Sequence, residues 1–184
     1  EWVHLGTHTN KPSRPAARNT PKPTPKAPKL RTIAPADREQ QFHLSLHSEI
    51  EAAPSIGPQA AKYFNAVGIR TVSDLLNANP ASVAAELGQH HITAHTIADW
   101  QMQARLVCQI PELRGYGAQL LVACGFTSPE QIAGTRVADL IRKIQAFCQS
   151  KQGQRILRNS EVPSPAKIKR WIQNAAQRRP LEAA

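Results

Sequence analysis

A segment of this chain recurs 57 positions further along, and this internal repeat constrains the fold more than any other feature of the sequence. The matching positions are mostly Pro, Gly and apolar residues, which mark the turns and the buried positions of a supersecondary unit. They pair Pro54, Ile56, Ala61, Phe64, Ala66, Gly68, Ile69, Thr71 and Leu75 with Pro111, Leu113, Ala118, Leu121, Ala123, Gly125, Phe126, Ser128 and Ile132. The sequence therefore predicts two copies of one helical hairpin.

Residues that favour helix ends divide the chain from Pro54 onward into short helices. We expect capped helices to begin after Thr71, Asn79, Thr93, Ser128, Thr135 and Ser164, a further helix to carry Pro58 in its first turn, and glycines 68, 88 and 125 to end helices. Upstream, Phe42, Leu44 and Leu46 alternate with polar residues, which favours a short extended segment packed on the first hairpin. A helix over residues 37–52 is the alternative.

A second match links two longer helices. Thr93, Ile97, Trp100 and Ala104 correspond to Ser164, Ile168, Trp171 and Ala175 at an offset of 71 positions. Each hairpin is thus followed by a helix that carries a Trp, and we expect each Trp to pack on its own hairpin. The larger offset, 71 against 57, leaves 14 additional polar and basic residues, near 150–162, in the second copy.

Charge is distributed unevenly along the chain, whose net charge is +10. Residues 1–36 hold seven Lys and Arg against one acid, residues 37–141 hold six against ten, and residues 142–179 hold ten against one. We expect a polyanion to bind at the two ends rather than in the middle. Residues 1–36 also contain seven Pro residues, so we expect a disordered, basic, Pro-rich arm there.

Several functional classes find no support in the sequence. Catalysis lacks a nucleophile triad, a Gly-rich phosphate loop or paired carboxylates, so we expect no enzyme, no cofactor and no small-molecule substrate. Three histidines, His90, His91 and His95, lack the further ligands that a metal site needs. We read the three cysteines as buried thiols in a reducing, cytoplasmic compartment. With neither a membrane span nor a signal peptide visible, we expect no membrane partner.

The residues around the first repeat resemble a known domain class. Ala53 to Ala61, followed by Val67 to Leu76, is similar to the helix-hairpin-helix domains of DNA repair proteins and to the C-terminal domain of the bacterial RNA polymerase alpha subunit. Residues 42–178 resemble the bacterial domain-of-unknown-function 4332 family, a match that the segment from Ile110 to Tyr116 supports. The resemblance implies an all-α fold of two tandem helix-hairpin-helix (SAM-like) units, residues 37–109 and residues 110–179, the second degenerate and ending in a basic helix.

In DNA-binding members of this class, a Gly-hydrophobic-Gly turn brings backbone N–H groups close to a phosphate without reading bases. The corresponding turns here are Ser55-Ile56-Gly57 and Glu112-Leu113-Arg114, so three of the four glycines are replaced and Glu112 adds a repelling charge. The residues that we predict to contact phosphate are Ile56, Gly57, Gln59 and Lys62 at the first turn, Arg114 and Gly115 at the second, and Lys167, Lys169, Arg170, Arg178 and Arg179 near the C-terminus, with Arg155 and Arg158 close by.

Two hypotheses for function remain open at this point. The first is a non-catalytic module that binds nucleic acid weakly and without sequence preference, with DNA favoured over RNA. The second is a protein-interaction or scaffold domain with no nucleic-acid role. The acidic middle and the altered second turn favour the scaffold, whereas the ten cations within residues 142–179 favour the nucleic-acid partner.

Overall fold

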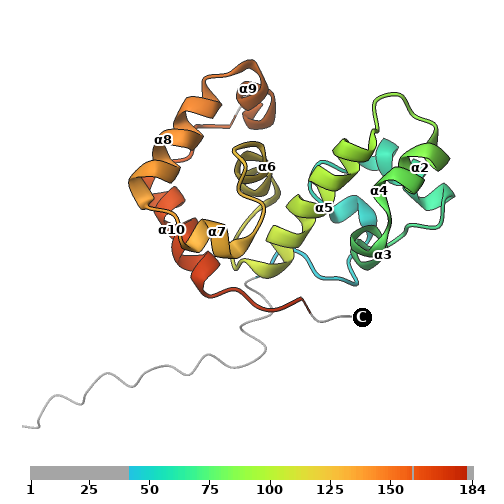
Figure 1. The fold of residues 1–184 in the computed structure, drawn as a ribbon, viewed down its shortest axis with the longest axis horizontal. Helices are drawn as coiled ribbons and strands as arrows, with labels where there is room; N and C mark the ends of the chain where they lie inside the picture. Colours follow the sequence, from blue (N-terminus) through green and yellow to red (C-terminus); the bar gives the residue numbers. More distant parts are fainter. Residues whose placement is uncertain (1–41, 159, 182–184) are drawn as a thin grey trace, which may run out of the picture. The chain divides into compact units, whose positions relative to one another are not determined.

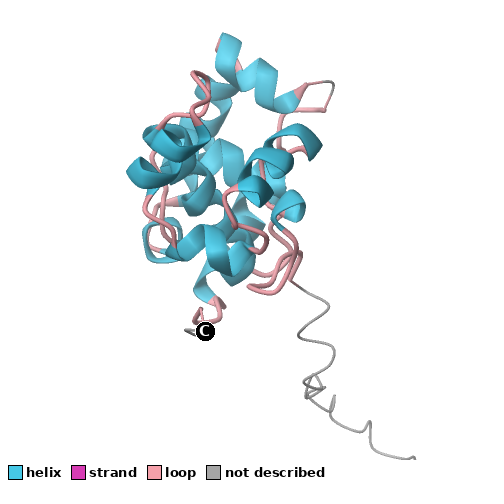
Figure 2. Ribbon diagram, turned by 90° about the vertical axis from the view of Figure 1, so that its right-hand side faces the viewer, coloured by secondary structure: helices cyan, strands magenta, loops and turns pink. Residues whose placement is uncertain are grey.

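The computed structural model describes residues 42–158 and 160–181 of the chain, and the regular structure within these ranges is helical. An isolated antiparallel bridge joins Glu49 to Thr71. Figure 2 shows the helices and the short loops that connect them. The predicted all-α fold class is confirmed for this part of the chain. The predicted arm of residues 1–36 lies outside the described residues.

The helix boundaries follow the two offsets found in the sequence. The elements are η1 (Ile50–Ala52), α2 (Pro58–Ala66), α3 (Val72–Asn77), α4 (Pro80–Leu87), α5 (Ala94–Gln109), α6 (Gly115–Ala123), α7 (Pro129–Ala133), α8 (Val137–Cys148), α9 (Lys151–Leu157) and α10 (Pro165–Ala176). Helices α6, α7 and α8 each begin 57 residues after α2, α3 and α4, and α10 begins 71 residues after α5. Left-handed backbone also recurs, at Gly68 and Gly125 (φ 84° and 85°) and at Ser55 and Glu112 (φ 66° and 56°).

Side-chain caps explain where most of the helices begin. Thr71 accepts a hydrogen bond from the amide of Asp74, whose carboxylate accepts from the amide of Thr71, so the pair forms a capping box. The caps predicted at Asn79, Thr93, Ser128 and Ser164 are also present. The cap predicted at Thr135 is wrong. Its hydroxyl donates to the carbonyl of Gln131 at the end of α7, and α8 begins one residue later, after Arg136, without a side-chain cap.

The segment before η1 is not helical over its described residues; it is irregular and makes a turn at residues 45–48, where the amide of Ser48 donates to the carbonyl of Ser45. Leu44 is buried in the core, while the amides of Val72 and Ser73 donate to the carbonyls of Ser48 and Leu46. The segment therefore lies along the start of α3, as predicted, but the turn interrupts the extended conformation that the alternating apolar pattern favours. The alternative helix over residues 37–52 is not formed between residue 42 and residue 49.

Helix α5 joins the two copies of the repeat. It packs on α3 and α4 of its own copy and on α6 of the next, while α10 packs on α7 and α8 (Figure 1). Corresponding helices thus make corresponding contacts in both copies. Helix α9 occupies the additional residues of the second copy and packs on both α8 and α6.

Each Trp contacts an aromatic ring on the first helix of its own hairpin. Trp100 lies 5.9 Å from Phe64 of α2, and Trp171 lies 6.2 Å from Tyr116 of α6, measured between ring centroids. The two environments nevertheless differ, because Trp171 is 4% exposed whereas Trp100 is half-buried. A Cβ added at Gly117 would lie 2.9 Å from the Trp171 ring, so that ring fits closely against the α6 backbone.

Truncation of the two Trp residues should have unequal effects on stability. We expect Trp171→Ala to lower the free energy of unfolding by about 3–5 kcal/mol, because it empties a buried site. Trp100→Ala should cost less, because part of its ring already contacts water. Urea denaturation followed by circular dichroism measures both values, and equal losses would contradict the difference in burial.

Helix α9 depends on a glycine at its centre. A Cβ at Gly153 would clash with the carbonyl oxygen of Phe147 and approach Cα of Cys148 to 2.7 Å. Gly to Ala inside a helix ordinarily stabilises by about 1 kcal/mol, whereas overpacking against backbone costs about 1–3 kcal/mol. We expect Gly153→Ala to destabilise the protein in urea denaturation, with exposed Lys151→Ala as the control that changes stability by less than about 0.5 kcal/mol.

Candidate functional site

The first helices of the two hairpins begin without a side-chain cap. Gly57 precedes α2 and Arg114 precedes α6, and no side chain accepts a hydrogen bond from the first amides of either helix. Helix α8 also lacks such a cap, whereas α3, α4, α5, α7, α9 and α10 each have one. Uncapped amides at a helix N-terminus favour an anion.

Residues at the starts of α2 and α6 line one hollow, which we call the turn cleft: Gly57 directly precedes α2, and Gly115 is the first residue of α6. The volume of the cleft is ≈ 680 Å³. The walls are formed by the first hairpin turn, one face of α5, the start of α6 and the end of α9; the lining includes Ser55, Ile56, Gly57, Asp99, Gln103, Gly115, Tyr116, Gln119, Arg155 and Arg158. The cleft thus brings together four segments that are far apart in the sequence, and two of its walls carry cations or uncapped amides.

Ser55 fixes the first hairpin turn despite its unfavourable backbone conformation. Its φ of 66° lies in the left-handed region, where a residue with a Cβ is strained and glycine is not. The Ser55 hydroxyl donates to Oε1 of Gln103, at 2.7 Å, and accepts from Nε2 of Gln119, at 2.9 Å. Because Gln103 is on α5 and Gln119 is on α6, this hydroxyl ties the turn to both copies of the repeat.

A second hollow, the C-terminal hollow, lies at the second hairpin turn and has a volume of ≈ 340 Å³. Its lining includes His43, Glu112, Arg114, Tyr116, Lys167 and Arg170. The ammonium of Lys167 lies 4.8 Å from the centre of the Tyr116 ring. A third hollow, of ≈ 440 Å³, runs from Tyr116 and Lys167 past residues 160–164. Tyr116 lines all three of these hollows, so they adjoin one another at this residue.

Glu112 places a negative charge at the second turn. Its carboxylate lies 3.8 Å from the Arg170 guanidinium, and both side chains are more than half exposed. An exposed pair at this distance contributes little to stability. The backbone of Glu112, with a φ of 56°, is strained in the same left-handed region as that of Ser55. Within the described part of the chain, Glu112 lacks the two hydrogen bonds that stabilise the first turn.

The structure brings some of the predicted phosphate contacts together and separates others. Ile56, Gly57 and Gly115 line the turn cleft, and Arg114, Lys167 and Arg170 line the C-terminal hollow. The side chain of Ile56 is buried and its amide donates to the Ala53 carbonyl, which leaves that residue no group for a phosphate. Gln59, Lys62 and Lys169 are exposed but line none of the three hollows.

Two predicted cations make contacts within the protein instead. Arg178 pairs with Glu130. The Arg179 guanidinium donates to the carbonyls of Cys108 and Leu44, at 2.7 and 3.0 Å, and its backbone amide donates to the carbonyl of Gln109. The carbonyls of Cys108 and Gln109 belong to the last turn of α5, which has no intrahelical donor for them. We therefore assign Arg179 to the fold and remove it from the phosphate contacts.

A family model described as a domain of unknown function, DUF4332, matches residues 54–178. The chain belongs to this family. The matched region spans both hairpins, both Trp-bearing helices and all three hollows except His43. No curated protein and no solved structure matches the chain.

Three residues of the site were not predicted from the sequence: Gln103, Tyr116 and Gln119. Gln103 could have been recognised in the sequence, because it is a polar residue on the otherwise apolar face of α5, one helical turn after Trp100. Buried polar residues are rare enough to mark a special environment. Tyr116 and Gln119 gave none, since their role depends on how α6 lies against the first turn and α9.

Three further features of the described region concern its cysteines, its potential metal ligands and the lengths of its helices. Burial raises the pKa of the Cys108 and Cys124 thiols to about 11, and it also raises the pKa of Cys148, so thiolates are scarce at neutral pH. Within residues 42–158 and 160–181, no group of three His, Cys, Asp or Glu side chains is placed to hold a metal ion. No helix in those ranges is long and apolar enough to cross a membrane.

The two left-handed turn residues should respond differently to glycine. Glu112→Gly removes backbone strain and an exposed ion pair, so we expect a stability change between zero and a gain of about 1 kcal/mol. Ser55→Gly relieves the same backbone strain but removes two hydrogen bonds and leaves the buried Gln103 carbonyl unpaired, so we expect a net loss of about 1 kcal/mol. Chemical denaturation measures both, with Glu112→Gln as the variant that keeps the strained backbone. A loss for Glu112→Gly as large as that for Ser55→Gly would contradict this account.

Proposed function

We propose that this protein binds the phosphate backbone of nucleic acid, duplex DNA in the first place, weakly and without sequence preference. The observation that carries the proposal is the gathering of cations from three separate segments around Tyr116. Arg114 comes from the second turn, Arg155 and Arg158 from α9 and the residue after it, and Lys167 and Arg170 from α10. We call these five side chains, with Tyr116, the Tyr116 surface.

The charge of this surface supports weak binding rather than tight binding. Asp99, Glu112 and Glu161 line the same hollows as the five cations, so they offset part of the positive charge. Each phosphate neutralised contributes a slope of about −0.9 to the dependence of log K on log salt concentration. A surface with three to five usable cations should therefore give a slope of about −3 to −4.5.

The kind of donor on this surface supports binding that does not depend on sequence. Guanidinium and ammonium groups and the uncapped amides at the start of α6 recognise phosphate oxygens, which are the same for every base. The hairpin turns carry one glycine of the four that close approach to a phosphate would favour, which again predicts modest affinity. The resemblance to helix-hairpin-helix domains places DNA before RNA as the first polymer to test.

The alternative role, a protein-interaction scaffold, receives less support from the surface. Among the residues that the structure describes, Val162 is the single large hydrophobic side chain that is exposed, at 39%. Protein interfaces usually centre on buried aromatic or aliphatic anchors. The Tyr116 surface offers one such ring, and Lys167 lies over it.

Salt titration tests the proposal. We expect a fluorescent duplex of about 20 base pairs with 5′-hydroxyl ends to bind at about 50 mM salt and to be released as salt rises, with the slope given above. The variant Arg114→Gln/Lys167→Gln/Arg170→Gln, whose three residues line the C-terminal hollow, should weaken binding by about tenfold or more and reduce the slope by about 1–3, because it removes contacts to phosphate.

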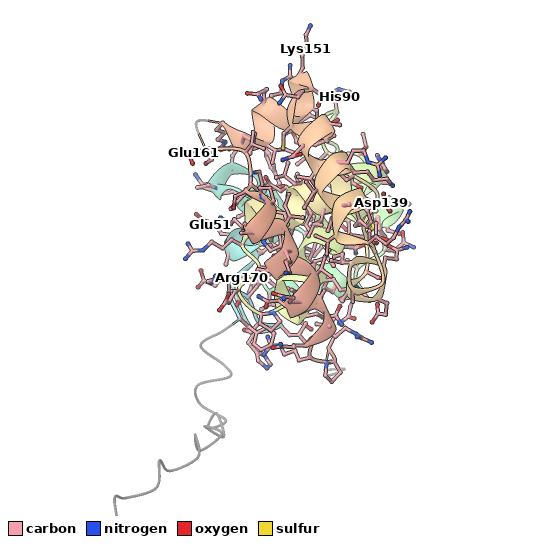
Figure 3. The ribbon with its side chains drawn as sticks, turned by 90° about the vertical axis from the view of Figure 1, so that its left-hand side faces the viewer. Glu51, His90, Asp139, Lys151, Glu161 and Arg170 are labelled. Carbon is pink, nitrogen blue, oxygen red and sulfur yellow. The ribbon has the colours of Figure 1, made fainter. Side chains whose placement is uncertain are left out.

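A matched variant separates this surface from overall charge. Arg105→Gln/Arg136→Gln/Arg142→Gln also removes three exposed cations, and none of them lines the hollows. Two of them pair with Asp139, which Figure 3 places at the opposite edge of the view from Glu161. We expect this control to bind nearly as the parent does. Equal losses in both variants, or no binding of the parent at low salt, would refute the proposal.

A further inference from the structure

Gln103 is the buried polar side chain of the described core. It is 8% exposed, and every other core residue in that part of the chain is apolar. It lies on α5 among Ala104, Leu106 and Val107, and it lines the turn cleft. Burying an amide without hydrogen bonds costs free energy, so its placement needs a partner for each polar atom.

Only half of the Gln103 amide has such a partner. Its Oε1 accepts from the Ser55 hydroxyl, but no described residue accepts from its Nε2. No fully buried side-chain nitrogen or oxygen in the described part of the chain lacks a hydrogen bond. The Nε2 group therefore reaches the open space of the turn cleft, where an acceptor can meet it.

The opposite wall of the turn cleft carries positive charge that the protein does not neutralise by close pairing. Arg155 and Arg158 are exposed and form no ion pair with any described residue. Asp99, the acid in the lining, has His95 as its nearest ionisable partner, at 3.7 Å. The uncapped first turn of α6, with Gly115, adds amide donors to the same space. The cleft thus presents donors and cations from three segments, and Asp99 is the one carboxylate among its described lining residues.

We propose that the turn cleft binds a terminal phosphate monoester on a nucleotide, either the 5′ end of a strand or a free mononucleotide. The cleft volume, ≈ 680 Å³, lies within the range of small-molecule sites. A monoester carries nearly two negative charges at neutral pH and matches two guanidinium groups, whereas an internal diester carries one. Lys167, whose ammonium lies over the Tyr116 ring beside the cleft, adds a further cation near the nucleotide.

This inference rests on the proposed function, because the turn cleft is lined by part of the Tyr116 surface and would bind the terminal phosphate of the same nucleic acid. The test compares single strands of about 12 nucleotides that differ in a 5′-phosphate or a 5′-hydroxyl and carry a 3′ fluorophore. We expect the phosphorylated strand to bind about tenfold more tightly, since the terminal phosphate adds charge-assisted hydrogen bonds. Competition by deoxyadenosine 5′-monophosphate, with deoxyadenosine as its control, separates a free mononucleotide from a strand end.

Two variants locate the effect. Gln103→Glu keeps the size of the side chain and the acceptor for Ser55 but places a negative charge in the cleft, so it should abolish the preference for the phosphorylated strand. Arg155→Gln/Arg158→Gln should do the same from exposed positions that do not affect folding, with Arg105→Gln/Arg142→Gln as the control of equal charge. Thermal melting checks that each variant is folded before binding is measured.

The outcomes separate this inference from the proposed function. If duplex with 5′-hydroxyl ends binds but the 5′-phosphate gives no preference and the mononucleotide does not compete, the inference is overturned and the proposed function stands. A preference that survives in folded Arg155→Gln/Arg158→Gln also overturns it. If the mononucleotide competes while no duplex binds, the cleft is a nucleotide site and the proposed function fails. A preference lost in the cleft variants alone supports the inference.

Discussion

Helix α5 is the element on which the rest of the fold depends, because its side chains form hydrogen bonds and ring contacts with the hairpin that precedes it. The Gln101 amide donates to the carbonyls of Leu75 and Ala78 at the end of α3. Gln103 accepts from the Ser55 hydroxyl, and the Trp100 ring lies beside Phe64. One helix thus holds the hairpin before it in place, and its packing on α6 positions the copy that follows.

In the second copy, a side chain of the Trp-bearing helix also forms a hydrogen bond to the hairpin turn, but to a backbone carbonyl. Asn174 lies 71 residues after Gln103, and its amide donates to the carbonyl of Pro111, at 2.9 Å, which directly precedes the second turn. Both copies therefore use a polar side chain of the Trp-bearing helix to hold their own turn. In the first copy the bonded group is the Ser55 hydroxyl, and in the second copy it is the Pro111 carbonyl. Ser55 lines the turn cleft, whereas Glu112 lies near Arg170.

Local sequence signals predicted most helix starts, because caps and prolines act within a few residues of where they lie. Thr71, Asn79 and Ser164 are examples. The cap predicted at Thr135 was wrong because a hydroxyl can donate to a carbonyl at the end of one helix as readily as it accepts from an amide at the start of the next. Helix α9 was not predicted, since its polar, basic sequence lacks an apolar period and its glycine is required by contact with α8. The turn cleft could not be predicted from local signals, because it exists only where α5, α6, α9 and the first turn meet.

The position of Arg179 has a consequence for how the chain can be divided. This residue follows the second copy in sequence, yet it completes the last turn of the long helix of the first copy and also holds the carbonyl of Leu44. The repeat units are therefore interlocked rather than merely adjacent. A fragment that ended between them would lose the donors for those carbonyls, so the described region should unfold cooperatively, in a single transition, instead of one copy at a time.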